Sequence, residues 1–354
     1  MATLQKRLAK TEERKPMSSP AVLWVGIIFS FAFTGLIWLL GPYLPEIDFL
    51  PDTGAAWYFW QLPEPTFWSR ATAWGGYILH QVAIWGLIFY AQRKRPKYTK
   101  GLHNFNIWAI GINALFIVLH LLQTHIWYDG LAQDVSIFSS QGSVILMLVA
   151  ILLMENSRRG LFFGKKVNFL RETGRVMRKY HGYIFAWAVI YTFWYHPMEV
   201  TGGHLIGFLY TFLLLVQGSL MFTRAHLNRW WTMALEVTVL VHGTLVAILA
   251  GNDLWPMFFF GFAAMFIVTQ MYGLGLGKWA RWGFIVAYVV GVVVVYSSRG
   301  WEYLNEIVRI PVIEYLLVFV LALIIWLIVR LGGLVTNRIR SRKMVAPGET
   351  GSPA

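Results

Sequence analysis

Histidine is the residue type in this chain whose positions most clearly suggest chemistry. His181 follows Tyr180, and His196 lies fifteen residues further on. A helix with a rise of 1.5 Å per residue separates these two imidazoles by about 22 Å along its axis. Imidazole is the usual axial ligand of a low-spin haem, and helix bundles gather such ligands in their cores. The spacing therefore predicts a membrane-length helix with a histidine near each end, as two stacked haems would require.

A second stretch of the chain repeats this pattern. His226 and His242 are sixteen residues apart, and glycine follows both His181 and His242. A glycine beside the ligand lets a flat macrocycle approach the backbone. At 100° per residue, His181 and His196 lie about 60° apart around a helix, whereas His226 and His242 lie about 160° apart. His226 is therefore either outside the regular helix or not a ligand.

The elements that must position these histidines are long apolar helices. The chain has 354 residues, of which 57% are hydrophobic and 13% charged, and apolar runs of about 20 residues recur along it. We therefore expect an all-α, polytopic membrane helix bundle with about ten transmembrane helices. The predicted spans are residues 21–41, 72–92, 104–126, 139–155, 182–198, 204–223, 231–250, 255–275, 280–298 and 312–333.

Basic residues give these spans an orientation. Of the 30 lysines and arginines, 27 lie in the N-terminal leader, in alternate loops and in the C-terminal tail, and the others are Arg70, Arg299 and Arg309. Because cytoplasmic loops carry the excess of basic residues, both termini are predicted to be cytoplasmic, in a bacterial inner (plasma) membrane. The net charge of +13 is accounted for by topology and contact with anionic membrane lipids, and we expect no nucleic-acid partner.

The same patterns divide the chain into four predicted segments. These are a charged cytoplasmic leader (1–20), a histidine-bearing transmembrane core (21–275), a two-span scaffold extension (276–335) and a basic cytoplasmic tail (336–354). The chain has no cysteine, which excludes disulfides, thiolate clusters and covalent haem attachment. It also lacks glycine-rich nucleotide-binding motifs, so electrons would have to come from a partner.

The predicted topology sorts the histidines into two layers. Four of them fall in the outer half of the membrane on four separate spans, and others fall near the cytoplasmic side. Histidines near helix ends, namely His125, His204 and His226, are expected to bind a backbone carbonyl or a lipid phosphate. The outer layer comprises His80, His120, His196 and His242. The inner layer comprises His103 and His181, with His226 nearby.

The stretch from Tyr180 to Gly243 resembles membrane b-type cytochromes of the cytochrome b561 and ferric-reductase-like transmembrane group. The likeness extends to residues 103–125, but the histidine spacing is wider than in that group and the predicted spans are more numerous. The resemblance implies non-covalent haem b and electron transfer across the membrane or with a quinone. The implied iron ligands are His120, His181, His196 and His242. The full set of cofactor-binding candidates adds His80 and His103.

Two other classes of function remain open from the residues alone. One is a non-haem metal or acid–base membrane enzyme that uses the outer histidines to bind a metal or to transfer protons. The other is a transporter or assembly factor whose histidines are structural, although the sequence shows no inverted repeat. If the chain is part of an enzyme, the haem interpretation makes it an oxidoreductase component.

Glu236 is the single carboxylate placed well inside a predicted span. An ionisable group at that depth is a candidate functional residue, here for proton exchange on the cytoplasmic side. The alternative is a protonated acid that bonds a neighbouring helix, with Gln217, Gln270 and His226 nearest in depth.

The loop from Arg158 to Lys179 is the most basic in the chain. We expect it to dock an acidic electron-transfer partner protein on the cytoplasmic side. On the other side, the aromatic stretch 57–68 is expected to lie at the membrane interface or to form a portal for a quinone.

Overall fold

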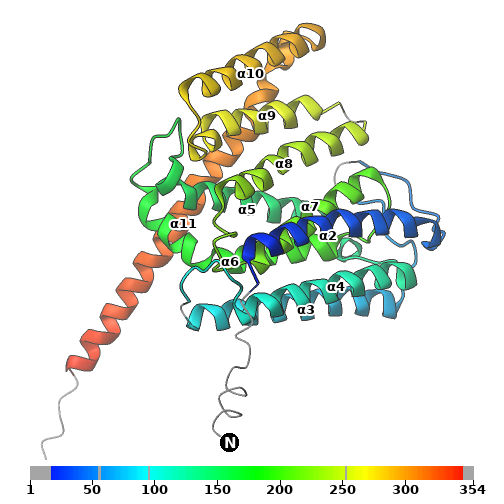
Figure 1. Cartoon of the computed structure of the whole chain (residues 1–354), viewed down its shortest axis with the longest axis horizontal. Coiled ribbons are helices and arrows are strands. Elements are labelled where there is room, and N and C mark those ends of the chain that lie inside the picture. The colour runs from blue at the N-terminus through cyan, green and yellow to red at the C-terminus, as the bar shows by residue number, and fades with distance from the viewer. Residues whose placement is uncertain (1–16, 55–56, 95, 252, 346–354) are drawn as a thin grey trace, which may run out of the picture. The chain divides into compact units, whose positions relative to one another are not determined.

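The structure is a computed structural model that describes residues 17–54, 57–94, 96–251 and 253–345 (Figure 1). The described residues are helical with three isolated β-bridges and no strand, which confirms the predicted all-α fold. Residues 1–16 of the predicted leader and residues 346–354 of the predicted tail lie outside the described part. The helices are α2 (Ser19–Leu40), η1 (Gly41–Tyr43), α3 (Phe67–Lys94), α4 (Asn104–Trp127), η2 (Leu131–Gln133), α5 (Ile137–Arg159), α6 (Leu170–Tyr195), α7 (Gly202–Ser219), α8 (Arg229–Leu249), α9 (Trp255–Val268), η3 (Gln270–Gly273), α10 (Lys278–Arg299), η4 (Trp301–Asn305) and α11 (Glu306–Val345).

Eight helical stretches of the described chain are long and apolar enough to cross a membrane. They include every long helix except α3 and α6. Their surfaces carry large exposed apolar side chains, such as Trp24, Ile28 and Val294, each more than 60% exposed. Such surfaces are suited to contact with lipid tails, and the chain is therefore a multi-pass membrane protein.

Helices α3 and α6 have the length of a span but a more polar composition. They contain 28 and 26 residues, or about 42 Å and 39 Å of helix. The first ten residues of α6, from Leu170 to Lys179, include five charged side chains. Arginine, glutamate, methionine and lysine all favour a helix, so this basic stretch continues into the apolar one. His181 therefore lies inside α6, not at its start, whereas His196 follows its last residue as expected.

The chain separates into two compact units. Unit 1 consists of the residues up to Met147 together with Gly182–Ala263, and unit 2 consists of Leu148–His181 together with the residues from Ala264 onward. The helices α5, α6 and α9 each contribute residues to both units. The segment boundary predicted near residue 275 stays a prediction.

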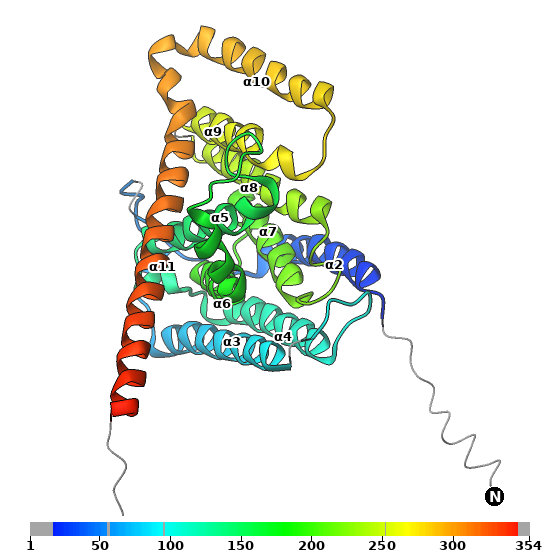
Figure 2. The same cartoon turned by 90° about the vertical axis from the view of Figure 1, so that its left-hand side faces the viewer.

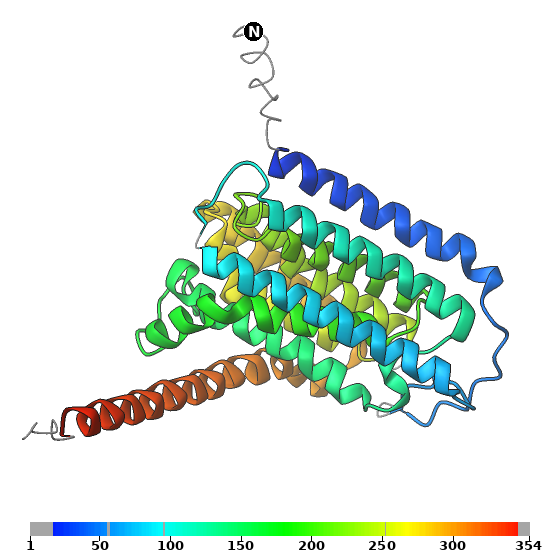
Figure 3. The same ribbon diagram turned by 90° about the horizontal axis from the view of Figure 1, so that it is seen from below.

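In unit 1, helix α3 packs against α4, α2 packs against α7, and α7 also contacts α4 and α8. The axes of α2, α3 and α4 run nearly parallel in Figure 3. The end of α6 lies inside this unit, because Phe193, Trp194 and Tyr195 are each at most 1% exposed. A Cβ atom at Gly76 of α3 would lie 2.2 Å from the Trp194 ring, so the close approach of the indole requires glycine there.

In unit 2, the beginning of α6 packs against the end of α5. A Cβ atom at Gly174 would lie 2.7 Å from the carbonyl oxygen of Leu153, which fixes how closely the two segments approach. The side chain of Asn156 donates to the Val167 carbonyl and accepts from the Val167 N–H, both at 2.9 Å. These contacts hold the connection between the two helices.

The other part of unit 2 is the turn from α10 into α11. Figure 2 shows the short helix η4 joining the two. Arg299 at the end of α10 forms an ion pair of 3.0 Å with Glu306, the first residue of α11, and Tyr296 donates to the same carboxylate. Both arginine and glutamate are mostly buried, so the pair fixes this turn.

Candidate functional site

The candidate site lies in unit 1, around His204 near the start of α7. The Nε2 atom of His204 is hydrogen bonded to the hydroxyl of Tyr58, and Nδ1 lies 2.7 Å from the hydroxyl oxygen of Thr201. Thr201 is the N-cap of α7, and its hydroxyl oxygen also accepts from the His204 backbone N–H at 3.3 Å. Threonine is a favoured cap, so a local preference sets the orientation of the imidazole.

These three side chains form a row that can carry a proton in either direction. A neutral imidazole has one N–H and one acceptor nitrogen, while each hydroxyl can donate or accept. Moving one proton from end to end therefore reverses both hydrogen bonds of the row without breaking either. Burial raises the pKa of Tyr58 well above its ordinary value, so its hydroxyl stays protonated at neutral pH.

His196 stands beside this row and has a defined tautomer. Its ring centroid lies 5.2 Å from that of Tyr58 and 5.8 Å from that of His204. Its Nδ1 lies 3.1 Å from the carbonyl oxygen of Thr192, which can only accept, so Nδ1 carries the proton. Among the described residues, nothing is hydrogen bonded to Nε2. His196 is also partly exposed, so this basic nitrogen is the one best placed to meet a substrate.

Two buried acidic side chains lie in loops of unit 1, namely Glu199, which interacts electrostatically with Tyr58, and Asp129, which follows α4. Glu199 is buried, with its carboxylate accepting from the Val200 N–H at 3.3 Å. Burial raises the pKa of Glu199, although that hydrogen bond and the charge of His125 oppose the shift. Burial also raises the pKa of Asp129, which is paired with Arg70 at 2.8 Å. Both carboxyl groups therefore hold a proton more tightly than an exposed acid does.

His120 connects the site to α4. Its Nε2 lies 2.9 Å from the carbonyl oxygen of His196 and must donate to it, while Nδ1 lies 3.1 Å from Oε1 of Gln123. The ring packs against Trp194, with centroids 4.4 Å apart, and against Phe193. His120 therefore anchors the backbone that carries His196.

His80 lies deeper in the unit and is fully buried. Its Nε2 is 2.8 Å from Oδ1 of Asn113, and its Nδ1 accepts from the Trp194 indole at 3.3 Å. The Asn113 amide nitrogen donates to Ser219 on α7 at 2.8 Å, so Oδ1 faces His80 and accepts from it. This network joins α3, α4, α6 and α7 through one neutral imidazole, and it fits a structural role.

His242 of α8 completes the outer layer predicted from the sequence. It lies close enough to His196 for an electrostatic interaction, and its ring centroid is 6.1 Å from that of Tyr210. Its buried Nδ1 has no hydrogen-bond partner among the described residues. Unit 1 thus brings together side chains from all four outer spans.

Each of the remaining histidines has at least one hydrogen bond to a nearby backbone carbonyl. His103 caps α4 and lies 3.3 Å from the Lys97 carbonyl through Nε2, and Nδ1 of His226 lies 2.9 Å from the Gln217 carbonyl. Nδ1 of His125 bonds the carbonyl of Leu121 at 2.8 Å, and Nε2 bonds the carbonyl of Leu40, 85 residues away, at 3.2 Å. The expected carbonyl contacts of His125 and His226 are confirmed. His181 belongs to unit 2, where its Nδ1 lies 2.8 Å from the Arg178 carbonyl.

Glu236 is buried in α8, 8% exposed, and lies close enough to Tyr210 for an electrostatic interaction. Two of the three partners suggested by depth are engaged with each other: Gln217 donates to the His226 carbonyl at 3.1 Å and accepts from Trp231 at 2.7 Å. Proton exchange at Glu236 stays a prediction.

The predicted haem ligands differ in how well they fit that role. A metal-binding histidine usually donates Nδ1–H to a carbonyl and presents Nε2 to the metal. His196 has this arrangement, Nδ1 of His181 likewise lies against a carbonyl, and the unpartnered Nδ1 of His242 is compatible with a ligand. In His80 and His120, by contrast, both nitrogens already have protein partners. A non-haem metal fits less well, since the described residues contain no group of three metal-ligating side chains.

The sequence interpretation placed Tyr58 only in an aromatic interfacial stretch. His204 was expected to bind a backbone carbonyl or a lipid phosphate, whereas its ring bonds two hydroxyl groups. Threonine three residues before His204, followed by two glycines, is a helix-start signal that could have placed the imidazole. Tyr58 lies 146 residues from His204, so no local pattern could link the two. Comparison with protein-family models, curated proteins and solved structures finds no match for this chain.

Proposed function

We propose that this membrane protein carries out acid–base chemistry at the histidine–tyrosine site of unit 1. The observation that carries the proposal is the hydrogen-bonded row of Tyr58, His204 and Thr201 beside the basic Nε2 of His196. Histidine is the side chain best suited to exchange protons near neutral pH. The proposed class is a membrane enzyme whose substrate reaches His196.

Each group has a part in the proposed proton transfer. Nε2 of His196 takes a proton from a hydroxyl group or a water molecule, while Nδ1–H stays bonded to the Thr192 carbonyl. Tyr58 donates its proton to the negative charge that develops on the substrate. The tyrosinate that remains accepts the hydrogen bond from Nε2–H of His204, whose Nδ1 accepts from the Thr201 hydroxyl. His196 has gained one proton and Tyr58 has lost one, so the protons balance, and return of a proton from His196 to Tyr58 through solvent restores the site.

The reactivity of individual histidines tests this proposal. Diethyl pyrocarbonate acylates the unprotonated nitrogen of an imidazole, and mass spectrometry gives the rate at each residue. We expect His196 to react at least tenfold faster than His80, whose two nitrogens are occupied, and to slow as the pH falls and Nε2 is protonated. The variant Thr201→Val should change the rate at His204 and leave that at His196. Equal rates at His196 and His80 would contradict a basic role for His196.

We also propose an arrangement of the chain in the membrane. Ten helices, including α3 and α6, cross it, and both termini lie in the cytoplasm of a bacterial inner membrane. This arrangement is supported by the lengths of α3 and α6 and by the distribution of basic residues. Reporter domains fused after Asp129 and after Lys166 should then report opposite sides of the membrane. Reporters on the same side would contradict the topology.

A second candidate function is haem-based electron transfer, favoured by the nitrogen arrangement of His196 and His242. Haem b, when bound, supplies one-electron chemistry, with a quinone or a partner protein at Arg158–Lys179 as the exchange partner. A pyridine haemochrome assay on protein expressed with ample haem should then show haem b, and His196→Ala should lower its content while His80→Gln should not. In that case Glu236→Gln should flatten the pH dependence of the midpoint potential. Absence of haem b would eliminate this candidate.

A further inference from the structure

Unit 2 has two adjoining surface cavities at the beginning of α6. One has a volume of about 410 Å³ and the other about 370 Å³, and both are lined by Asn168 and Arg171. The larger one extends to Arg175 on α6 and to Trp326 on α11. The smaller one extends to Lys166 in the preceding loop. Together they form a basic groove whose far wall is aromatic.

Three basic side chains of this groove are free to bind an anion. Lys166, Arg171 and Arg175 are exposed, and within the described residues none of them has an ion pair or a side-chain hydrogen bond. Other arginines nearby are engaged, since Arg158 is paired with Glu155 and Arg178 binds the Met154 carbonyl. Three free cations therefore line the groove.

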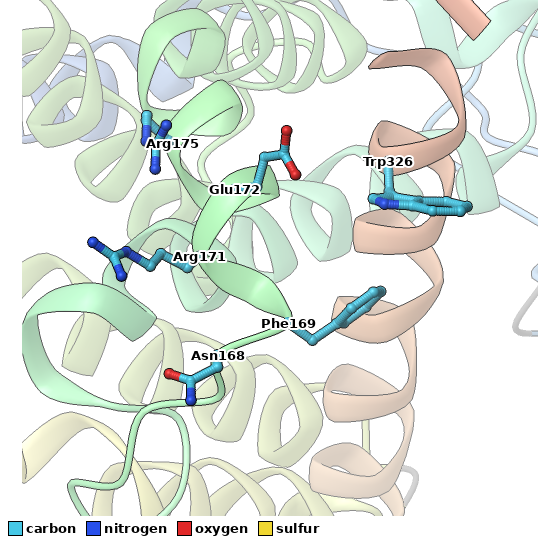
Figure 4. A pocket seen from close by; sticks show the side chains of 6 residues that line it. All are labelled: Asn168, Phe169, Arg171, Glu172, Arg175 and Trp326. Atoms are coloured by element: carbon cyan, nitrogen blue, oxygen red, sulfur yellow. The ribbon is translucent and has the colours of Figure 1, made fainter. Parts of the chain in front are cut away.

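The opposite wall is apolar and continues into a lipid-facing helix. Phe169 is 50% exposed, and Figure 4 shows that it extends toward α11, which carries Trp326. The guanidinium of Arg330 lies over the Trp326 ring, 5.4 Å from its centroid. Further along α11, the apolar side chains of Leu323 and Leu327 are 48% and 44% exposed. A ligand with a charged end and an apolar end would match both walls.

Local structure holds the groove in this form. The two hydrogen bonds between Asn156 and Val167 fix the loop before α6, and Gly174 allows α6 to lie against the Leu153 carbonyl. Figure 4 shows Arg171 and Arg175 on one side of α6 and Glu172, the acidic residue of the groove, on the side that faces α11. A phosphate would therefore bind on the arginine side, away from the carboxylate.

We infer that this groove is a binding site for an anionic phospholipid such as phosphatidylglycerol. Guanidinium groups bind phosphate oxygens through charge-assisted, often bidentate hydrogen bonds. The start of a 26-residue helix adds partial positive charge to the same place. The lipid tails would run along Phe169, Trp326 and the exposed face of α11. A free phosphate or an acidic protein would use the cations but leave this apolar wall without a role.

Binding of defined lipids to the purified full-length chain tests the inference. Native mass spectrometry with phosphatidylglycerol and with phosphatidylcholine of identical acyl chains gives the two affinities. We expect phosphatidylglycerol to bind about tenfold more tightly, and Arg171→Gln/Arg175→Gln to remove that preference. The matched control, Arg224→Gln/Arg229→Gln, removes two exposed basic side chains from unit 1 and should retain it. Equal losses in both double variants would show an unspecific charge effect and overturn the site.

A second measurement distinguishes the source of the phosphate and the class of partner. A photoreactive phosphatidylglycerol should crosslink to the peptides that contain Phe169 and Trp326, and excess phosphatidylglycerol should prevent this. If inorganic phosphate prevents it equally at the same concentration, the groove binds phosphate and not lipid. If an acidic peptide prevents it while unlabelled phosphatidylglycerol does not, the groove is a protein-docking surface. Either result would contradict the inference, and neither bears on the chemistry of His196.

Discussion

Two pairs of histidines in unit 1 obtain their hydrogen bonds in different ways. His80 and His120 bond groups that are 33 to 114 residues away in the sequence, on other helices or the ends of other helices. His103 and His226 bond backbone carbonyls only six and nine residues away. His80 and His120 therefore depend on the packing of several helices, whereas His103 and His226 are satisfied by the local chain. A site that needs precise geometry can be built from the first kind.

Replacement of a single histidine in each set should show this difference directly. His80→Leu leaves Oδ1 of Asn113 and the Trp194 indole without partners in a buried place, which should cost about 2–5 kcal/mol. His103→Leu removes contacts at a helix end and should cost about 1 kcal/mol or less. Thermal unfolding of the purified proteins measures both. Equal losses of stability in the two variants would mean that the hydrogen bonds of His80 add nothing beyond local bonding.

The close packing around the network of His80, Asn113 and Trp194 provides a second test with a smaller expected effect. Gly76→Ala would place a methyl group 2.2 Å from the Trp194 ring, so the indole must move and its bond to His80 must weaken. We expect a loss of about 1–3 kcal/mol. The matched control is the preceding residue, because Gly75→Ala meets no atom within 4 Å and should be neutral or slightly stabilising. If both variants unfold at the same temperature, the fit of Trp194 against α3 is not tight.

The smallest expected effect concerns the buried acid Glu199 and depends on pH. Because burial raises the pKa of Glu199, the folded state binds this proton more tightly than the unfolded state does. Its contribution to stability is full below the ordinary pKa of glutamate and is lost as the pH rises through the raised value. Glutamine cannot ionise, so Glu199→Gln avoids this loss. Between pH 4 and pH 8, the melting temperature of the variant minus that of wild type should therefore increase by about 2 °C.

Asp134 provides the control of opposite sign. Although partial burial acts against it, hydrogen bonds from Arg70 and Trp74 lower the pKa of Asp134. Its contribution to stability is therefore present above the ordinary pKa of aspartate and is lost as the pH falls through the lowered value. Asp134→Asn should lower the melting temperature at pH 8 and have less effect at pH 3. A shift of the same sign in both variants would show that burial and pairing do not set these two carboxyl groups apart.

Much of the fold was predictable because the bilayer imposes a simple rule on the sequence. Spans must be long and apolar, and the predicted spans coincide with helices of the structure. The predicted start of the helix that carries His181 was wrong, because α6 begins at Leu170. The basic residues before His181 favour a helix as strongly as the apolar residues after it. The convergence of His80, His120, His196 and His242 was predicted from their common depth, and the structure places them in one unit. Their role as haem ligands stays a prediction.

The sequence by itself determined the class of the protein, its helical segments and local bonds such as that of His226. These depend on hydrophobicity and on partners within a few residues, which a linear pattern records. Only the tertiary structure decided that Tyr58 meets His204 and that Nε2 of His196 is left as a basic nitrogen. The reason is that a hydrogen bond between distant segments depends on how the helices pack, and packing arises from the summed contacts of the whole unit.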